Sequence, residues 1–198
     1  CSLDLSAFYF DIRKDILYCD EVKSLKRQTC INLLGLILDV LLKWFAPILS
    51  FTTEEIFQII NKESNLSVHL ENFPNIPSKW EDKKLSEKWT KLKIVRHVVN
   101  AAIEVKRASK DIGSSLEADI QVYLDEKYLK LTNDVDLSEY FITSRAIAKP
   151  LNNDNKLFKL DDVDGIKVLI KKATGNKCTR CWKILQNPCD RGNCGLKN

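Results

Sequence analysis

Apolar side chains recur every three to four positions along the first hundred residues, a spacing that predicts amphipathic helices. Residues 5–18 gather their apolar side chains near one face and their charged ones opposite, so one helix is expected there. A more apolar run, 21–46, stops at Pro47, which cannot continue a regular helix. Residues 81–110 contain neither Gly nor Pro and keep the helical spacing, which predicts a long helix that closes a bundle.

Two serine or threonine positions have the spacing of a capping box, in which two side chains satisfy the first free N–H groups of a helix. Thr52 precedes Glu55, which predicts a helix beginning near residue 53. Ser78 precedes Glu81 in the same way and predicts the start of the long helix. The stretch 62–79 lacks periodicity, so it is expected to be a loop.

After residue 113 the hydrophobic period changes from about four to two, which is typical of strands. Short alternating runs at 118–124, 156–160 and 166–173 predict three strands, and 136–143 predicts a short helix between them. The expected fold class is therefore mainly α: a helical bundle, then a small α+β domain, then a short terminal segment.

The run from Ile31 to Phe51 is nearly long enough to cross a bilayer, so a membrane span has to be weighed. Asp39 and Lys43 interrupt it with an i,i+4 spacing that lets them pair on one exposed strip. Charged groups within a membrane segment are costly. A bundle helix and no membrane contact are therefore expected.

The net charge of +4 is unremarkable, but the charge is unevenly distributed. Residues 166–198 carry eight Lys or Arg and a single Asp, whereas residues 117–164 are acidic on balance. Clustered cations favour a polyanion partner, because phosphate neutralisation supplies most of the sequence-independent affinity for nucleic acid. A solvated basic tail is the alternative.

Four of the seven cysteines lie in the last 21 residues. Cys178 and Cys181 form a C-x2-C pair, and Cys189 and Cys194 follow with C-x4-C spacing. Four thiolates make a closed tetrahedral site, so one structural zinc ion and no catalytic residue are predicted. Free thiols, disulfides or a degenerate site without metal remain alternatives. Reduced thiols of this pattern also indicate a cytoplasmic protein.

Basic and aromatic side chains are interleaved with these cysteines. Trp182 follows the C-x2-C pair and could stack on an unpaired RNA base, with Arg180, Lys183 and Arg191 on phosphates. Equally, Trp182 could pack over the metal turn. A terminal segment of some 23 residues with so few apolar side chains is expected to depend on the metal for its fold and to leave these four side chains facing outward.

Several motifs occur in order along the chain: SLDLSAFYFDIRKDILYCD, FAPILSFTTEEIF, SVHLENFP, KDIGSSLEADIQVY and KCTRCW. Together they resemble the C-terminal part of bacterial-type isoleucyl-tRNA synthetases. The second motif is shared with the valine and leucine enzymes, whereas V-H-L-x-x-F-P and K-C-x-R-C-W are narrower. The family usually closes its metal site with a second C-x2-C pair, so the C-x4-C spacing here is a departure.

This resemblance implies a helical anticodon-binding domain (1–112), a small α+β junction domain (113–175) and a zinc-binding segment (176–198). It implies that the partner is the anticodon stem-loop of isoleucine tRNA. A monomer is expected separately, because Asp39 and Lys43 place the apolar helix in a soluble bundle. The sequence has no Met and lacks the H-I-G-H and K-M-S-K-S signatures, which indicates a piece of a longer ligase. ATP, catalysis and editing are expected in the remainder, so this piece should be inactive alone.

Two other classes of function remain open from the sequence. One is the equivalent region of a valyl- or leucyl-tRNA synthetase, or a free-standing RNA-binding module. The other is a zinc-dependent protein-interaction module. Competition between isoleucine, valine and leucine tRNAs distinguishes the first class from an isoleucyl-tRNA synthetase. Absence of RNA binding at low salt would favour the protein-interaction module.

Overall fold

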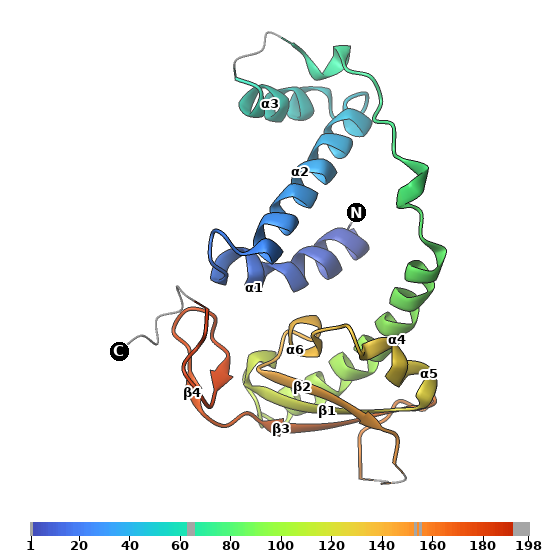
Figure 1. Cartoon of the computed structure of the whole chain (residues 1–198), viewed down its shortest axis with the longest axis vertical. Helices are drawn as coiled ribbons and strands as arrows, with labels where there is room; N and C mark the ends of the chain where they lie inside the picture. Colours follow the sequence, from blue (N-terminus) through green and yellow to red (C-terminus); the bar gives the residue numbers. More distant parts are fainter. Residues whose placement is uncertain (1, 63–65, 153, 155, 192–198) are drawn as a thin grey trace. The chain divides into compact units, whose positions relative to one another are not determined.

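The chain is described by a computed structural model over residues 2–62, 66–152, 154 and 156–191. Its contacts divide it into two compact units. We call Val22–Asp82 the helical unit, and Cys1–Glu21 together with Lys83–Asn198 the sheet unit. The predicted fold class, mainly α with a small α+β part, is confirmed (Figure 1). The predicted domain boundaries stay predictions, and the first helix packs within the sheet unit.

The helical unit is built from two helices, α2 (Leu25–Phe45) and α3 (Ser50–Ile60), and a 3-10 turn at Val68–Leu70. The predicted ion pair forms on α2, where Lys43 Nζ lies 3.0 Å from Asp39 and 3.5 Å from Glu71. Glu71 follows the turn, so the pair also ties this turn to α2. The small apolar core consists of Leu42, Ala46, Phe57 and Val68.

Helix α2 is long and apolar enough to cross a membrane by length and composition alone. Core helices of soluble proteins pass the same test, so the feature is weak evidence. Only Cys30 and Leu42 of this helix are buried. The ion pair between Lys43 and Asp39 lies on the same helix and would be costly within hydrocarbon. The expectation of no membrane contact stays a prediction.

The predicted start of α3 is wrong, because the helix begins at Ser50 rather than near residue 53. Thr52 therefore lies inside the first turn and does not cap it. The chain turns immediately after Pro47, and Thr53 Oγ1 donates to the backbone oxygen of Leu49 at 3.0 Å. Glu54 serves another purpose, since it accepts hydrogen bonds from Ser67 and from the N–H of Val68.

Two helical segments pack within the sheet unit beside its strands. A π-helical segment, Ser2–Phe10, continues directly into α1 (Asp11–Cys19), in agreement with the single predicted helix. The predicted long helix is α4 (Lys83–Ala108). Its predicted cap is wrong, because Ser78–Trp80 forms a separate 3-10 turn before α4 begins.

The sheet has three strands in the order β2-β1-β3 (Figure 1). Strand β1 (Ala118–Leu124) pairs parallel with β2 (Arg145–Pro150) and antiparallel with β3 (Ile166–Lys172). The predictions for β1 and β3 are confirmed. The strand expected at 156–160 is wrong, because only Phe158 forms a bridge there. Instead β2, which sequence reasoning missed, supplies the third strand.

One face of this sheet carries the core. Alternate residues of β1 and β3 are buried, as the period of two requires, and they pack with α4 and with two short helices. These are α5 (Glu126–Leu129) and α6 (Leu137–Tyr140), capped by the side chains of Asp125 and Asp136. Arg96 of α4 is buried and donates to the backbone oxygen of Tyr140 at 2.7 Å. The core thereby fixes α6 and the start of β2, which adjoin the terminal segment.

Candidate metal centre and nucleic-acid interface

A short hairpin forms the described part of the terminal segment. Strand β4 (Asn176–Lys177) pairs with β5 (Ile184–Leu185), and the turn between them carries the C-x2-C pair. The N–H of Trp182 donates to the oxygen of Cys178 at 3.0 Å, and the N–H of Cys178 donates to the oxygen of Lys183 at 2.9 Å. These bonds fold the turn back so that both cysteine side chains point to one side.

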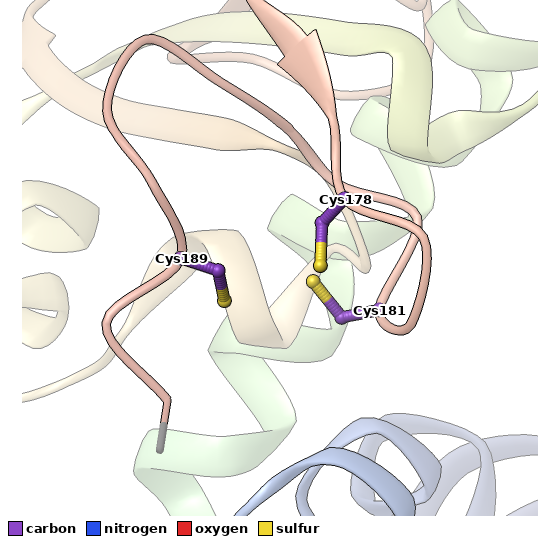
Figure 2. A group of neighbouring side chains, drawn as sticks. All are labelled: Cys178, Cys181 and Cys189. Carbon is purple, nitrogen blue, oxygen red and sulfur yellow. The ribbon is translucent and has the colours of Figure 1, made fainter. Parts of the chain in front are cut away.

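Three thiols of the predicted metal set are brought together (Figure 2). The Sγ atoms of Cys178, Cys181 and Cys189 all lie within 4.8 Å of one another. Sulfur atoms around a tetrahedral zinc lie about 3.8 Å apart, because each Zn–S bond is about 2.3 Å. The three cysteines are free of disulfides, and the first two are buried. This cluster can hold a metal ion, whereas the fourth predicted ligand, Cys194, lies outside the described residues.

A further buried thiol, which sequence reasoning did not associate with the cluster, comes from the end of α1. Cys19 packs with Cys178 and Cys181 in one buried group. Burial, and then the charge of Asp15, raise the pKa of the Cys19 thiol. Its position 159 residues before Cys178 gave no spacing signal, since only the fold brings α1 to the hairpin.

The Cys181 thiol of the cluster is disposed to stay protonated without a metal. Burial raises the pKa of Cys181 to about 11, and the neighbouring thiols Cys178 and Cys189 act in the same direction. A coordinated thiol is by contrast deprotonated outright, because the cation replaces the lost proton. The environment of Cys181 therefore favours either a neutral thiol or a bound metal over a free thiolate.

The basic side chains of the terminal segment dock it onto α1. Arg191 Nη2 lies 2.6 Å from the carboxylate of Asp15, and Lys183 Nζ lies 3.6 Å from it. Arg191 Nε also lies 3.3 Å from Asp20. Burial raises the pKa of Asp15, but the hydrogen bond from Arg191 and the charge of Lys183 lower it by more, so its net pKa lies below the usual value. Two cations thus share one partly buried carboxylate.

Arg180 closes the end of α1 in a different way. Its Nη2 and Nε donate to the backbone oxygen of Tyr18 at 2.6 and 3.2 Å. The last carbonyls of a helix have no partner within the helix, and a cation near them also complements the helix dipole. The guanidinium nevertheless remains exposed at the surface.

Trp182 is exposed, at 60% of its full accessibility. Its φ of +63° places it in the left-handed region, which is uncommon for a bulky residue and is often found at functional sites. Lys177 Nζ lies 5.7 Å from the centre of its ring. The larger part of the indole is therefore exposed to solvent.

A cavity of about 310 Å³ lies beside this indole, between α1, α6 and the hairpin. Tyr18 and Ile142 supply apolar walls, with Lys14 and Arg180 among the polar lining. Ile142 also has a positive φ, +56°, which is rarer still for a β-branched residue. Two strained residues thus line one cavity next to the candidate metal centre.

The four predicted RNA-contacting side chains therefore divide into two pairs. Arg180 and Trp182 are exposed, as expected. Lys183 is buried against Asp15, so the expectation that it faces outward is wrong, and Arg191 is mostly covered by the same carboxylate. The sequence showed the positive charge of the segment but not the acidic residues of α1 that neutralise part of it.

One glycine makes a clear test of the hairpin. Gly175 has a φ of +133°, and a Cβ there would lie 2.2 Å from the backbone oxygen of Leu185. Gly175→Ala is expected to destabilise the hairpin by about 1–3 kcal/mol, because the strain falls on backbone that cannot yield cheaply. Amide hydrogen exchange of residues 176–185 would show the loss of protection.

The matched control for that change is Gly35→Ala. Gly35 lies inside α2 with open space around its Cβ position. Alanine there is expected to stabilise the helix by up to about 1 kcal/mol. Unchanged exchange of the hairpin in the Gly175 variant would mean that the hairpin is not built as described.

Comparison with known proteins gives consistent similarities. Residues 1–124 match the family described as the anticodon-binding domain of tRNA ligase. The chain is 49% identical to the isoleucine–tRNA ligase of Pelagibacter ubique over 191 residues, which is 96% of this chain. It is 44% identical to the isoleucine–tRNA ligase of Rhodopseudomonas palustris over 93% of this chain. It is 46% identical to the isoleucine–tRNA ligase of Bradyrhizobium diazoefficiens over 92% of this chain. It spans about a fifth of the length of these relatives, at 20%, 19% and 18% respectively.

Proposed function

Because the chain belongs to the family of anticodon-binding domains of tRNA ligases, we propose that it binds the anticodon arm of isoleucine tRNA as part of a longer isoleucine–tRNA ligase. The similarity to ligases of that name over nearly the whole chain is the observation that carries the proposal. In the intact enzyme, isoleucine would be joined to its tRNA at the expense of ATP. The catalytic and editing domains would lie in the rest of the protein, which would act as a cytoplasmic monomer.

Zinc is the metal that the cysteine cluster fits best. Soft thiolate ligands select zinc among the abundant divalent cations, and buried sulfurs within 4.8 Å of one another can share one ion. Cys178, Cys181 and Cys189 would supply three ligands and Cys194 the fourth. A closed set of four thiolates leaves no position for a reacting water, so the ion would be structural.

For the RNA contacts, we propose a division of labour that follows the exposure of the side chains. Trp182 would stack on an unpaired base of the anticodon loop, with the adjacent cavity accepting part of that nucleotide. Arg180 stands at the rim of the cavity and would contact a phosphate. Lys183 and Arg191 would act mainly by holding the segment on α1, because their charges face Asp15.

The test is competition between tRNAs for the purified 198-residue chain. Isoleucine tRNA is expected to bind best, with valine and leucine tRNAs weaker, and affinity should fall steeply between about 50 and 200 mM salt. Trp182→Ala should lower the affinity about tenfold or more, whereas Trp182→Phe keeps a stacking ring and most of the affinity. Gel-shift titrations at several salt concentrations measure the preference among tRNAs, the salt dependence and the effects of the two substitutions.

Each contrary result has a distinct meaning. Equal binding of the three tRNAs would leave a general RNA-binding module or a relative of the valine and leucine enzymes. Absence of RNA binding at low salt would favour a zinc-dependent protein-interaction module. A flat salt profile would contradict phosphate binding itself.

A further inference from the structure

The sheet has a second face, opposite the one that packs on α4, and it is not covered by the core. The pairing register places three side chains from each strand on it. None of these nine side chains is buried. They are Asp119, Gln121 and Tyr123 from β1, Arg145, Ile147 and Lys149 from β2, and Lys167, Leu169 and Lys171 from β3. We call this set the open sheet face.

The open sheet face is basic. It carries four cations and a single carboxylate, Asp119, whose Oδ2 lies 3.7 Å from Arg145. At the other end of β1, Tyr123 lies between Lys149 and Lys167 in the register of the sheet. An aromatic ring is therefore flanked by two ammonium groups on a pleated surface.

The lysines on either side of Tyr123 are held in place without being neutralised. Lys149 Nζ donates to the side-chain oxygen of Gln121 at 2.8 Å and lies 5.8 Å from the ring of Tyr123. The Tyr123 hydroxyl donates to the same oxygen at 3.1 Å. Lys167 Nζ donates at 3.1 Å to two backbone oxygens, those of Asn152 and Asp154. Neutral oxygens orient an ammonium group but leave its charge uncompensated.

Within the described residues, ion pairing differs between the arginine and the lysines of the open sheet face. Arg145 has a carboxylate partner in Asp119, but none of the three lysines forms an ion pair with any residue of the described ranges. Lys149 and Lys167 are both uncompensated and already oriented, a favourable arrangement for binding phosphate because little side-chain ordering remains to be done on association. Lys171 is exposed and lies opposite Asp119 in the register.

The open sheet face is also continuous with the hairpin. The N–H of Ile184 donates to Ser144 Oγ at 2.6 Å, and Ser144 immediately precedes Arg145 at the start of β2. On the other side, β3 runs into β4 within four residues. The end of the open sheet face that carries Asp119, Arg145 and Lys171 therefore adjoins the hairpin that presents Trp182, whereas Tyr123, Lys149 and Lys167 lie toward the opposite end.

We propose that the open sheet face is a second RNA-contact surface, on which Lys149, Lys167 and Lys171 bind backbone phosphates and Tyr123 stacks on a base. An aromatic side chain on a β-sheet is a recurrent platform for unpaired RNA bases, and flanking cations follow the backbone. A protein partner fits less well, because the cores of protein interfaces are depleted in lysine. The identity of the RNA as a tRNA rests on the function proposed above.

The experiment compares two doubly substituted chains in binding to isoleucine tRNA. Lys149→Gln with Lys171→Gln removes two cations from the open sheet face and leaves a polar side chain, one atom shorter, at each position. The control, Lys83→Gln with Lys84→Gln, makes the same charge change at two exposed positions of α4 in the same unit. Thermal unfolding of each chain checks that the fold is retained.

The sheet variant is expected to lose about tenfold in affinity at 0.1 M salt. The slope of log K against log salt should become shallower by about 1.4–1.8, since each lost phosphate contact accounts for about 0.7–0.9. The control should keep the slope of the unmodified chain. Tyr123→Leu should lose affinity with no change in slope, whereas Tyr123→Phe should bind as the unmodified chain does.

The outcomes separate this inference from the proposed function. In one outcome the unmodified chain binds tRNA and Trp182→Ala weakens the binding, but the sheet and control variants behave alike. The open sheet face then does not bind RNA, and a protein partner would fit it better. If the unmodified chain binds no tRNA at all, the proposed function fails first. A sheet variant that loses affinity with an unchanged slope would overturn the assignment of its lysines to phosphates.

Discussion

Cys181→Ser is expected to abolish metal binding by a chain that otherwise purifies with one equivalent of zinc. Cys181 is one of three thiols whose sulfur atoms lie within 4.8 Å of one another, and its side chain is buried at the centre of the hairpin turn. Serine is a poor zinc ligand, so the closed thiolate site cannot form. Zinc content by atomic emission, or release to a chromophoric chelator, measures the loss directly.

The matched control is Cys30→Ser. Cys30 is also a buried cysteine outside any disulfide, but it belongs to α2 in the helical unit. This variant is expected to retain one equivalent of zinc even if it loses some stability. Full zinc content in Cys181→Ser, or zinc loss in both variants, would show that the cluster is not the metal site.

The effect on the fold of Cys181→Ser should be confined to the hairpin and its contacts with α1. Metal coordination supplies about 10–16 kcal/mol to small zinc-binding segments, which have little apolar core of their own. The sheet and α4 form a separate continuous core that includes Leu92, Val99 and Ile120. Circular dichroism should therefore change little, whereas limited proteolysis should cut within residues 176–191.

In an intact ligase the same substitution should weaken tRNA charging far more than amino-acid activation. Adenylate formation would take place in the catalytic domain, whereas the hairpin would contribute only to holding the tRNA. Isoleucine-dependent ATP–pyrophosphate exchange and aminoacylation, measured side by side, separate the two steps. Equal losses in both assays would contradict a role confined to RNA binding.

The elements that sequence could predict are those whose own periodicity is strong. Strand β1 alternates buried and half-buried residues along its whole length, and α4 keeps a helical spacing over 26 residues. Strand β2 gave no such signal, because RAIAKP contains a single β-branched residue and ends in proline. Proline is tolerated there because β2 is an edge strand, whose position depends on pairing with β1.

The candidate site shows a similar division between local and long-range information. C-x2-C spacing predicts, without any structure, that Cys178 and Cys181 form a metal-binding pair. The approach of Cys19 and Asp15 depends on packing between segments more than 150 residues apart, for which the sequence has no periodic signal. For the same reason Lys183 could be recognised as a cation but not as a buried partner of a carboxylate.

Asp15→Asn is expected to loosen the terminal segment from α1 and to lower zinc affinity about 100-fold. The substitution keeps the shape of the side chain but removes the charge that Arg191 and Lys183 share. These side chains are only 22% and 10% exposed, so both cations would be left partly buried without that anion. Removing one partner from a buried ion pair costs about 3 kcal/mol or more.

Because folding of the segment and metal binding are coupled, this cost should appear as weaker zinc binding and not as global unfolding. Competition with a chelator of known affinity measures it. Asp4→Asn is the control, since Asp4 lies at the same end of the chain but pairs with Lys93 in an exposed position, where ion pairs contribute little. Equal zinc affinity of the Asp15 and Asp4 variants would show that the docking of the segment on α1 does not stabilise the metal centre. A loss in Asp15→Asn alone, accompanied by weaker binding of isoleucine tRNA, would establish that α1, the metal and the RNA-contacting turn act as one structural element.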